Sequence, residues 1–166
     1  LLSESLARLG AKVVGIDPAE ENVQVAKLHS EGDVSTQGIS YENTTIEDLA
    51  ASGRHFDIVC SLEVIEHVEN PLAFIEACGS CLRPGGSLFL STLNRSTKSY
   101  LLAILGAEHI TGLVPVGTHD WSKFITPDEM RKMVSTVAAV EEMSGIVFTP
   151  EIRGVTPSLL DKWKIS

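Results

Sequence analysis

Short apolar runs alternate with amphipathic segments along most of the 166-residue chain. Phe56–Leu62 (FDIVCSL) gives the strongest buried-strand signal, because it is a nearly continuous apolar run. The other predicted strands are Lys12–Asp17 (KVVGID), Ile39–Thr44 (ISYENT) and Ser87–Thr92 (SLFLST), with a last strand within Val137–Thr149.

Helices are predicted between these strands. Leu1–Leu9 is helix-like and ends at Gly10, a residue type suited to the position after a helix. Asp17 and Pro18 fit the N-cap and first position of a helix that runs to about Glu31. The remaining predicted helices are Ile46–Ala51, Pro71–Leu82 with its stop at Arg83-Pro84-Gly85-Gly86, Lys98–Ile110, and Pro127–Thr136 capped by Thr126.

Strands separated by helices predict an α/β fold, a doubly wound and mostly parallel sheet with helices on both faces. In such sheets, ligands bind beyond the carboxyl ends of the strands. The functional residues are therefore expected just after Asp17, Leu62 and Thr92.

Asp17 ends a predicted strand, where an acidic side chain can accept hydrogen bonds from the ribose hydroxyls of a nucleoside cofactor. The alternative is that Asp17 only caps the following helix. Both roles can hold together, because one carboxylate oxygen can cap while the other binds.

Three ionisable side chains follow the strongest strand, in Leu62-Glu63-Val64-Ile65-Glu66-His67-Val68. If this segment turns as a helix, Glu63, Glu66 and His67 lie on one face and could hold a divalent cation. Oxygen ligands favour Mg²⁺, whereas an imidazole favours Zn²⁺ or Mn²⁺. The alternative is a capping and hydrogen-bonding cluster that shapes the pocket floor without a metal.

Two later segments have open interpretations. Lys98–Leu113 is too short to span a bilayer, and could lie in a membrane interface, line a lipid-tail groove, or form an ordinary buried helix or lid. His119, in the loop Gly117–Trp121, is a candidate general base, or is held by hydrogen bonds within its own loop.

The charge and cysteine content of the chain limit which ligands it can bind and where it can reside. The formal net charge of −9 argues against nucleic acid, which needs clustered Lys and Arg, but leaves room for a small cation such as a sulfonium. Cys60, Cys78 and Cys81 give no disulfide framework and indicate a reducing compartment. Cys78 and Cys81 form a C-x-x-C within an apolar helical run, which favours packed core thiols over a redox or zinc site.

Several stretches together resemble the ubiquinone-biosynthesis O-methyltransferase family, and the resemblance covers almost the whole chain. LEVIEHV and PGG are generic to class I methyltransferases, whereas NRSTKSYLLAILGAEHI and GTHDWSKFI are more specific. The other stretches that resemble this family are LLSESLARLGAKVVGIDP, SLEVIEHVENP, VPVGTHDWSKFITPDEM and GIVFTP.

The resemblance implies a Rossmann-like class I methyltransferase fold and transfer of a methyl group from S-adenosylmethionine to a catechol hydroxyl of polyprenyl intermediates. It implies cofactor binding by Asp17 and Leu62, and Mg²⁺ at Glu63, Glu66 and His67. It also implies peripheral membrane association through about Ser96–Trp121, contact with other ubiquinone-biosynthesis proteins, and a location on the matrix side of the mitochondrial inner membrane or on the bacterial cytoplasmic membrane.

The chain also departs from this family. We expect one incomplete domain over residues 1–166, truncated at the N-terminus, where the family has a strand and a Gly-rich cofactor turn, and at the C-terminus as well. Val116 stands where a Lys is frequent in the family. Two other functions stay open: a class I methyltransferase acting on another small molecule or a protein, and a non-catalytic module of a membrane-bound biosynthetic complex.

Overall fold

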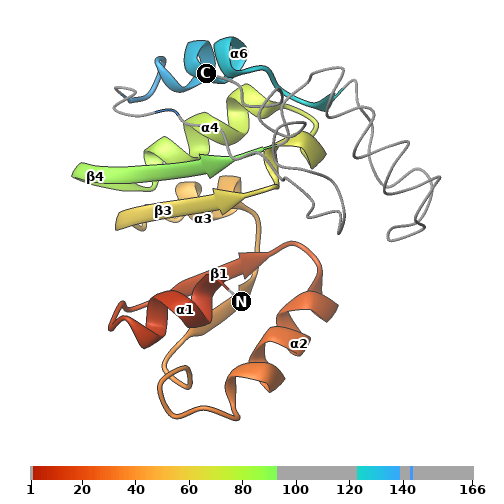
Figure 1. Ribbon diagram of the computed structural model, residues 1–166, viewed down its shortest axis with the longest axis vertical. Coiled ribbons are helices and arrows are strands. Elements are labelled where there is room, and N and C mark those ends of the chain that lie inside the picture. Colours follow the sequence, from red (N-terminus) through yellow and green to blue (C-terminus); the bar gives the residue numbers. More distant parts are fainter. Residues whose placement is uncertain (1, 93–122, 139–142, 144–166) are drawn as a thin grey trace, which may run out of the picture.

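The computed structural model describes residues 2–92, 123–138 and 143. Helices and strands alternate in it as the sequence pattern predicts (Figure 1). The elements are α1 (Leu2–Arg8), β1 (Val14–Asp17), α2 (Glu20–Ser30), β2 (Ser40–Asn43), α3 (Ile46–Ala51), β3 (Phe56–Leu62), the 3₁₀ helix η1 (Ile65–His67), α4 (Pro71–Ser80), β4 (Leu82–Ser91) and α6 (Pro127–Val134). The helix expected over Lys98–Ile110 lies outside the described residues, as does most of Val137–Thr149.

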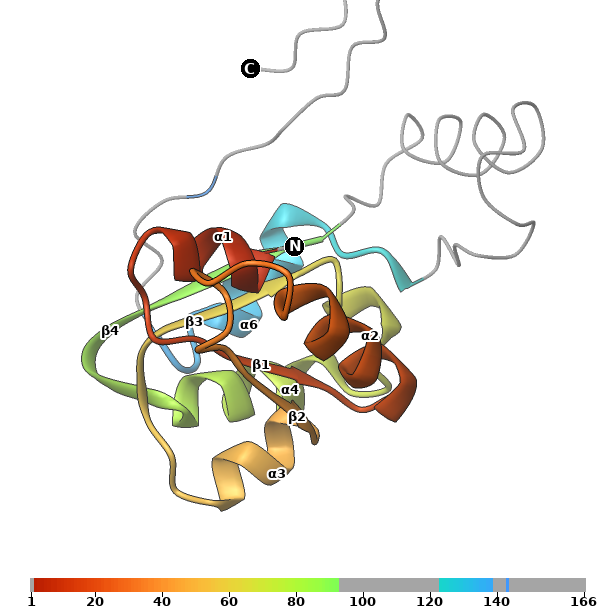
Figure 2. The same cartoon turned by 90° about the horizontal axis from the view of Figure 1, so that it is seen from below.

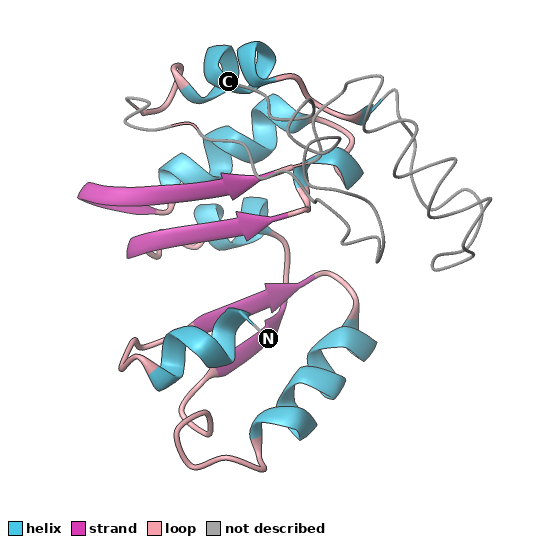
Figure 3. Cartoon of the chain, viewed as in Figure 1, coloured by secondary structure: helices cyan, strands magenta, loops and turns pink. Residues whose placement is uncertain are grey.

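The described strands form two parallel pairs. β1 pairs with β2, with Val14 opposite Ser40, and β3 pairs with β4, with Leu62 opposite Ser91. Figure 3 shows the strand arrows of both pairs pointing the same way, so that the carboxyl ends lie at one edge. Parallel pairing of this kind needs a crossover between partners, and the intervening helices provide it.

Helices cover both sides of the strands, which confirms the doubly wound arrangement (Figure 2). Gly15 faces the side of α1 and α2, because a Cβ built there would meet the Tyr41 ring at 2.8 Å and Ser3 Oγ at 3.1 Å. The next residue, Ile16, points the other way and packs against the core on the side of α3 and α4. Successive residues of β1 therefore face the two different helical layers, one on each side of the strand.

The core lies between the β3–β4 pair and the helices α3, α4 and α6. Ile75 and Cys81 are fully buried, and Val59 and Leu88 pack against this cluster from the strands. The buried members of the cluster are Ile46, Leu49, Ile65, Phe74, Ile75, Ala77, Cys78, Cys81, Ile125 and Met130. Ile65 belongs to η1, so the segment after β3 is anchored in the core.

Side-chain caps fix where several helices begin. Thr126 accepts a hydrogen bond from the Glu129 amide while the Glu129 side chain accepts from the Thr126 amide, a reciprocal capping box that confirms the predicted cap of α6. Asn70 caps α4 through the Ala73 amide. The predicted start of α2 is wrong by two residues: its N-cap is Ala19, because Asp17 and Pro18 form a turn before the helix.

β4 begins with an irregular segment. Phe56 pairs with Leu82 and Ile58 with Ser87, so two steps along β3 correspond to five along β4. Gly85 takes up the extra length with a φ of +80°, and a Cβ on Gly86 would meet the backbone oxygens of Asp57 at 2.9 Å and Arg83 at 3.0 Å. The predicted tight turn is thus contained within the strand, and the Gly pair allows it.

Candidate active site at the carboxyl edge of the strands

Of the site residues singled out by the sequence, those that the structure describes lie at the edge of the molecule where the strands end. Asp17 ends β1, Leu62 ends β3, and Glu63 follows Leu62 directly. Since the strands run in the same direction, this is the edge at which parallel α/β sheets bind ligands (Figure 1).

Asp17 uses one carboxylate oxygen to hold the start of α2. Its Oδ1 accepts a hydrogen bond from the Ala19 amide at 2.8 Å and one from Asn22 Nδ2 at 3.2 Å. The contact to residue i+2 is an Asx turn, which orients the side chain from its own backbone. Both hydrogen bonds end on Oδ1, so Oδ2 is the oxygen available to a ligand.

Asn43 braces the same turn from β2. Its Nδ2 donates to the backbone oxygens of Asp17 at 3.1 Å and Pro18 at 2.9 Å. Sequence reasoning did not select Asn43, although its place at the end of a predicted strand was a signal. The position of Asp17 is therefore set by the two neighbouring strands together.

Glu63 adopts a left-handed backbone conformation with φ of 55°. Its amide donates to Ser91 O at 3.1 Å and to Ser91 Oγ at 3.2 Å, and its Oε1 accepts from Ser91 Oγ at 2.6 Å. A non-glycine residue in this region costs about 1–2 kcal/mol, so the contacts with Ser91 hold a conformation that the chain avoids elsewhere.

Glu66 and His67 follow in η1, and their environments differ. Glu66 is 4% exposed and its Oε2 accepts from Thr92 Oγ1 at 3.1 Å, whereas His67 is exposed. Successive residues of a 3₁₀ helix project about 120° apart. Glu63 precedes this three-residue helix in a left-handed conformation, so the single α-helical turn considered for Glu63, Glu66 and His67 is not formed.

The arrangement of these side chains bears directly on the expected metal. Within residues 2–92, 123–138 and 143, no three His, Cys, Asp or Glu side chains lie together in a group that could hold a metal ion. Glu63 and Glu66 instead accept hydrogen bonds from two hydroxyls of β4 and its next residue. This geometry agrees with the hydrogen-bonded cluster that the sequence left as the alternative, and Mg²⁺ at these residues stays a prediction.

Leu62 and the hydroxyls Ser91 and Thr92 complete the edge. Leu62 is 45% exposed, as other apolar residues of β3 and β4 are (Ile58 55%, Phe89 54%), so its side chain is accessible to a ligand. The sequence placed Ser91 and Thr92 at the end of a strand but gave them no role, because their partners are 26 to 28 residues away.

The C-x-x-C pair lies away from this edge and inside the core. Cys78 is 1% exposed and Cys81 is 0% exposed. Burial raises the pKa of the Cys78 thiol to about 12 and also raises the pKa values of Cys60 and Cys81. Raised values keep the thiols neutral, which supports the interpretation as packed core residues.

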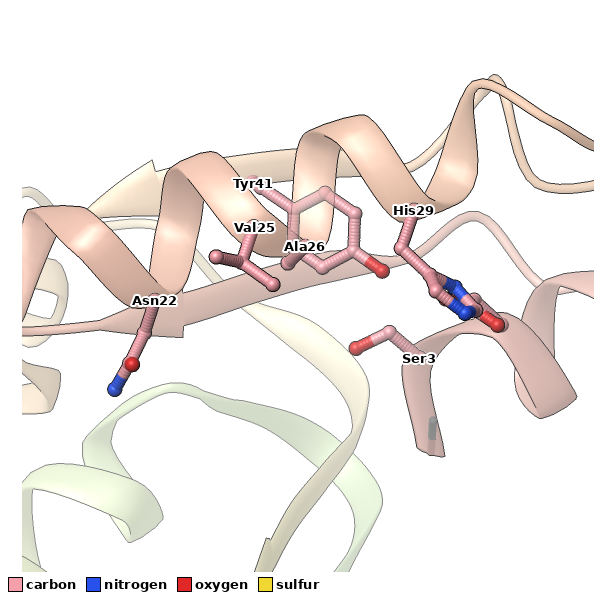
Figure 4. Close-up of a pocket in the computed structure, with 7 residues that line it drawn as sticks. Ser3, Asn22, Val25, Ala26, His29 and Tyr41 are labelled. Atoms are coloured by element: carbon pink, nitrogen blue, oxygen red, sulfur yellow. The ribbon is translucent and has the colours of Figure 1, made fainter.

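A cavity of about 320 Å³ lies between α1, α2 and β2 (Figure 4). Glu4 is 4% exposed and its Oε1 lies 2.6 Å from His29 Nδ1 at one end. Asn22, the residue that contacts Asp17, lines the cavity as well. The lining residues are Ser3, Glu4, Asn22, Val25, Ala26, His29 and Tyr41.

Two predicted regions lie outside the described residues. One is Ser96–Trp121, the stretch expected at a membrane, and the other is the candidate base His119 within that stretch. Among the helices of the described ranges, none has the length and apolar character that crossing a bilayer requires.

Comparison with known proteins decides which kind of α/β domain this is. A family model described as "Methyltransferase domain" matches residues 1–137. The chain belongs to this methyltransferase domain family. The methyltransferase match confirms the expected fold class, and it agrees with the parallel strands whose carboxyl ends form the candidate site.

Bacterial relatives named "Ubiquinone biosynthesis O-methyltransferase" are similar to this chain and confirm the resemblance. The protein of Cereibacter sphaeroides (strain ATCC 17025) is 53% identical over 151 residues, which is 90% of this chain and 60% of that protein. Those of Dinoroseobacter shibae and Parvibaculum lavamentivorans are 48% and 45% identical over the whole chain and 63% and 62% of their own lengths. The chain thus spans about 60% of the length of these relatives.

One solved structure has a similar fold. The co-crystal structure of WbdD with a kinase inhibitor matches 80% of this chain and 26% of its own, with a TM-score of 0.53 and 18% sequence identity. This likeness concerns the fold alone, and it agrees with the α/β arrangement described above.

Proposed function

We propose that the protein is an S-adenosylmethionine-dependent O-methyltransferase that methylates a catechol hydroxyl of polyprenyl intermediates in ubiquinone biosynthesis. The observation that carries the proposal is the 45–53% identity to enzymes of that name over 90–100% of the chain. The substrates meant are of the 3,4-dihydroxy-5-polyprenylbenzoate and demethylubiquinol types.

Cofactor binding is assigned to Asp17 and Leu62. The Asp17 Oδ2 atom would accept hydrogen bonds from the ribose hydroxyls, while Oδ1 keeps the turn in place through Ala19 and Asn22. The exposed Leu62 side chain supplies apolar contact. The turn braced by Asn43 is a rigid support, so little ordering is needed when the cofactor arrives.

The chemistry is an in-line displacement in which the phenol oxygen attacks the methyl carbon and the carbon–sulfur bond breaks. The protein must align the two atoms at near-attack distance, and the phenol proton must leave. A phenol has a pKa near 10, so a base is useful near neutral pH. His119 is our candidate for this base.

The metal expected at Glu63, Glu66 and His67 enters no step of this mechanism, because the described geometry does not unite the three side chains. Its role is decided by measuring methylation with Mg²⁺ and with EDTA, in wild type and in His67→Ala. A full loss of activity with EDTA that Mg²⁺ restores would return these residues to the role of ligands.

The location proposed for the enzyme is the cytoplasmic face of a bacterial membrane, since the relatives described above are bacterial. Peripheral contact through about Ser96–Trp121 would bring the active-site edge to a lipid-tailed substrate, alone or beside other ubiquinone-biosynthesis proteins. Pelleting of the full-length protein with phospholipid vesicles tests this contact, and a protein that stays in the supernatant argues against it.

The central test uses Asp17→Asn in the full-length protein. Asn keeps one oxygen for the Ala19 amide but replaces the second by an NH₂ group that cannot accept from a ribose hydroxyl. With a short-chain prenyl catechol as acceptor, we expect the KM for S-adenosylmethionine to rise about 10- to 100-fold, because a hydrogen bond to a charged group is lost. The exposed Asp128→Asn is the matched control.

Two results would overturn the proposal. One is a full-length wild-type protein that transfers no methyl group to the catechol. The other is an Asp17→Asn variant whose KM for the cofactor equals that of Asp128→Asn, which would remove Asp17 from the cofactor site.

A further inference from the structure

Two consecutive hydroxyl residues at the end of β4 hold two carboxylates of the segment after β3. Ser91 Oγ donates to Glu63 Oε1 at 2.6 Å, and Thr92 Oγ1 donates to Glu66 Oε2 at 3.1 Å. Consecutive residues of an extended chain point to opposite sides. The two hydroxyls therefore reach an exposed carboxylate and a buried one.

Ser91 and Glu63 are joined by three hydrogen bonds. The backbone oxygen and the hydroxyl of Ser91 both accept from the Glu63 amide, and the hydroxyl also lies against the Glu63 carboxylate. Glu63 has a φ of 55°, a conformation that persists in non-glycine residues only where surrounding contacts impose it. Such residues cluster at active sites and ligand clamps.

Thr92 donates the hydrogen bond that the buried Glu66 side chain accepts. A carboxylate that is 4% exposed has lost nearly all its water and needs a donor from the protein. Thr92 provides that donor across the gap between the two strand ends. Ile65, beside it in η1, is 1% exposed and fixes the same turn in the core.

We propose that Ser91 and Thr92 are positioning residues of the active site, which act on cofactor and catechol through Glu63 and Glu66. This inference rests on the proposed function, because it assigns the two carboxylates to the floor of the same site. Neither hydroxyl needs to touch a substrate: each fixes the direction of an acidic side chain at the carboxyl edge.

The experiment compares removal of each hydroxyl with its retention in the full-length protein. Ser91→Ala and Thr92→Val remove the donors at nearly constant volume, whereas Ser91→Thr and Thr92→Ser keep them. Ser87→Ala is the matched control, because Ser87 lies four residues earlier on the same side of β4 as Ser91. The readouts are kcat, both KM values, the Kd of S-adenosylhomocysteine, and amide hydrogen exchange across residues 63–67.

We expect Ser91→Ala to lower kcat about tenfold or more and to speed exchange of the Glu63 amide by a similar factor, since each effect reflects loss of a charge-assisted hydrogen bond. Thr92→Val should lower kcat similarly. Ser91→Thr and Thr92→Ser should stay within about threefold of wild type, as should Ser87→Ala.

The outcomes separate this inference from the proposed function. If wild type methylates the catechol but the four variants match Ser87→Ala in kcat and exchange, the positioning role is wrong and the function stands. If wild type methylates no catechol, the proposed function fails. Hydrogen exchange and the Kd of S-adenosylhomocysteine then still test whether the two hydroxyls position Glu63 and Glu66. If the conservative variants lose as much as Ser91→Ala and Thr92→Val, the hydroxyls do not position the site.

Discussion

At the scale of single residues, the most informative position is Glu63. It has the only positive φ of a non-glycine residue in the ranges that the structure describes. The sequence predicted a role for this residue from its place after a strand, but not its conformation, because left-handed turns are normally announced by Gly or Asn. The contacts that impose the conformation come from Ser91, 28 positions away.

A glycine at position 63 should relieve this backbone cost while destroying the site. We expect Glu63→Gly to be about 1 kcal/mol more stable towards urea than Glu63→Ala, with both equally impaired in methyl transfer. In the exposed middle of α2, Gln24→Gly should instead be about 1 kcal/mol less stable than Gln24→Ala. The same order at both positions would contradict a left-handed Glu63.

The three thiols give a second prediction at this scale. Because burial raises the pKa of Cys78 to about 12 and that of Cys81 above its usual value, neither forms the reactive thiolate near neutral pH. Ellman's reagent at pH 8 should label Cys78 and Cys81 only as fast as the native protein opens, and promptly in urea. Rapid labelling of both without urea would contradict their place in the core.

At the scale of elements, the sequence predicted most accurately the helix ends that depend on residues close by in the chain. The predicted cap at Thr126 acts over three residues and is confirmed, as is the predicted helix start at Pro71, which the structure shows to be capped by Asn70. α2 was placed two residues early because Asp17 fits an N-cap and an Asx turn equally well by sequence. Only the backbone of Ala19 distinguishes the two.

Removal of the Thr126 hydroxyl should weaken α6. Thr126→Ala loses the acceptor for the Glu129 amide, so we expect a loss of about 1 kcal/mol in the free energy of unfolding. Hydrogen exchange of the α6 amides should quicken accordingly. Thr126→Ser keeps the acceptor and serves as control, and a Ser variant as unstable as the Ala variant would show that the cap is not responsible.

At the scale of the whole molecule, the parallel direction of the strands and the two helical layers followed from the alternation of elements. The use of a common edge followed too, because it depends only on strand direction. The union of Glu63, Glu66 and His67 on one face did not follow. It assumed α-helical geometry, whereas the buried Ile65 and the contact between Glu66 and Thr92 favour a tighter 3₁₀ turn.

Acid should destabilise the fold partly through Asp33. Hydrogen bonds from Ser35 and Arg8 lower the pKa of Asp33 from 3.8 to about 2, so the folded state binds fewer protons than the unfolded state between these values. Stability is therefore full above pH 3.8 and falls as the pH drops towards 2. Asp33→Asn should flatten this part of the urea-stability curve, and Ser35→Ala should lie between it and wild type. An Asp33→Asn curve parallel to wild type would contradict the shift.

The irregular start of β4 has a consequence at the opposite end of that strand. The segment from Leu82 to Ser87, five steps along the chain, sets the register that brings Ser91 opposite Leu62. Side chains alternate along a strand, so inserting one residue into Pro84-Gly85-Gly86 would exchange inward and outward positions along β4 from Ser87 to Ser91. Leu90 would then present its alkyl group where Glu63 now finds a hydroxyl. The length of the Leu82–Ser87 segment thus determines whether a polar or an apolar side chain lies against Glu63 at the candidate site.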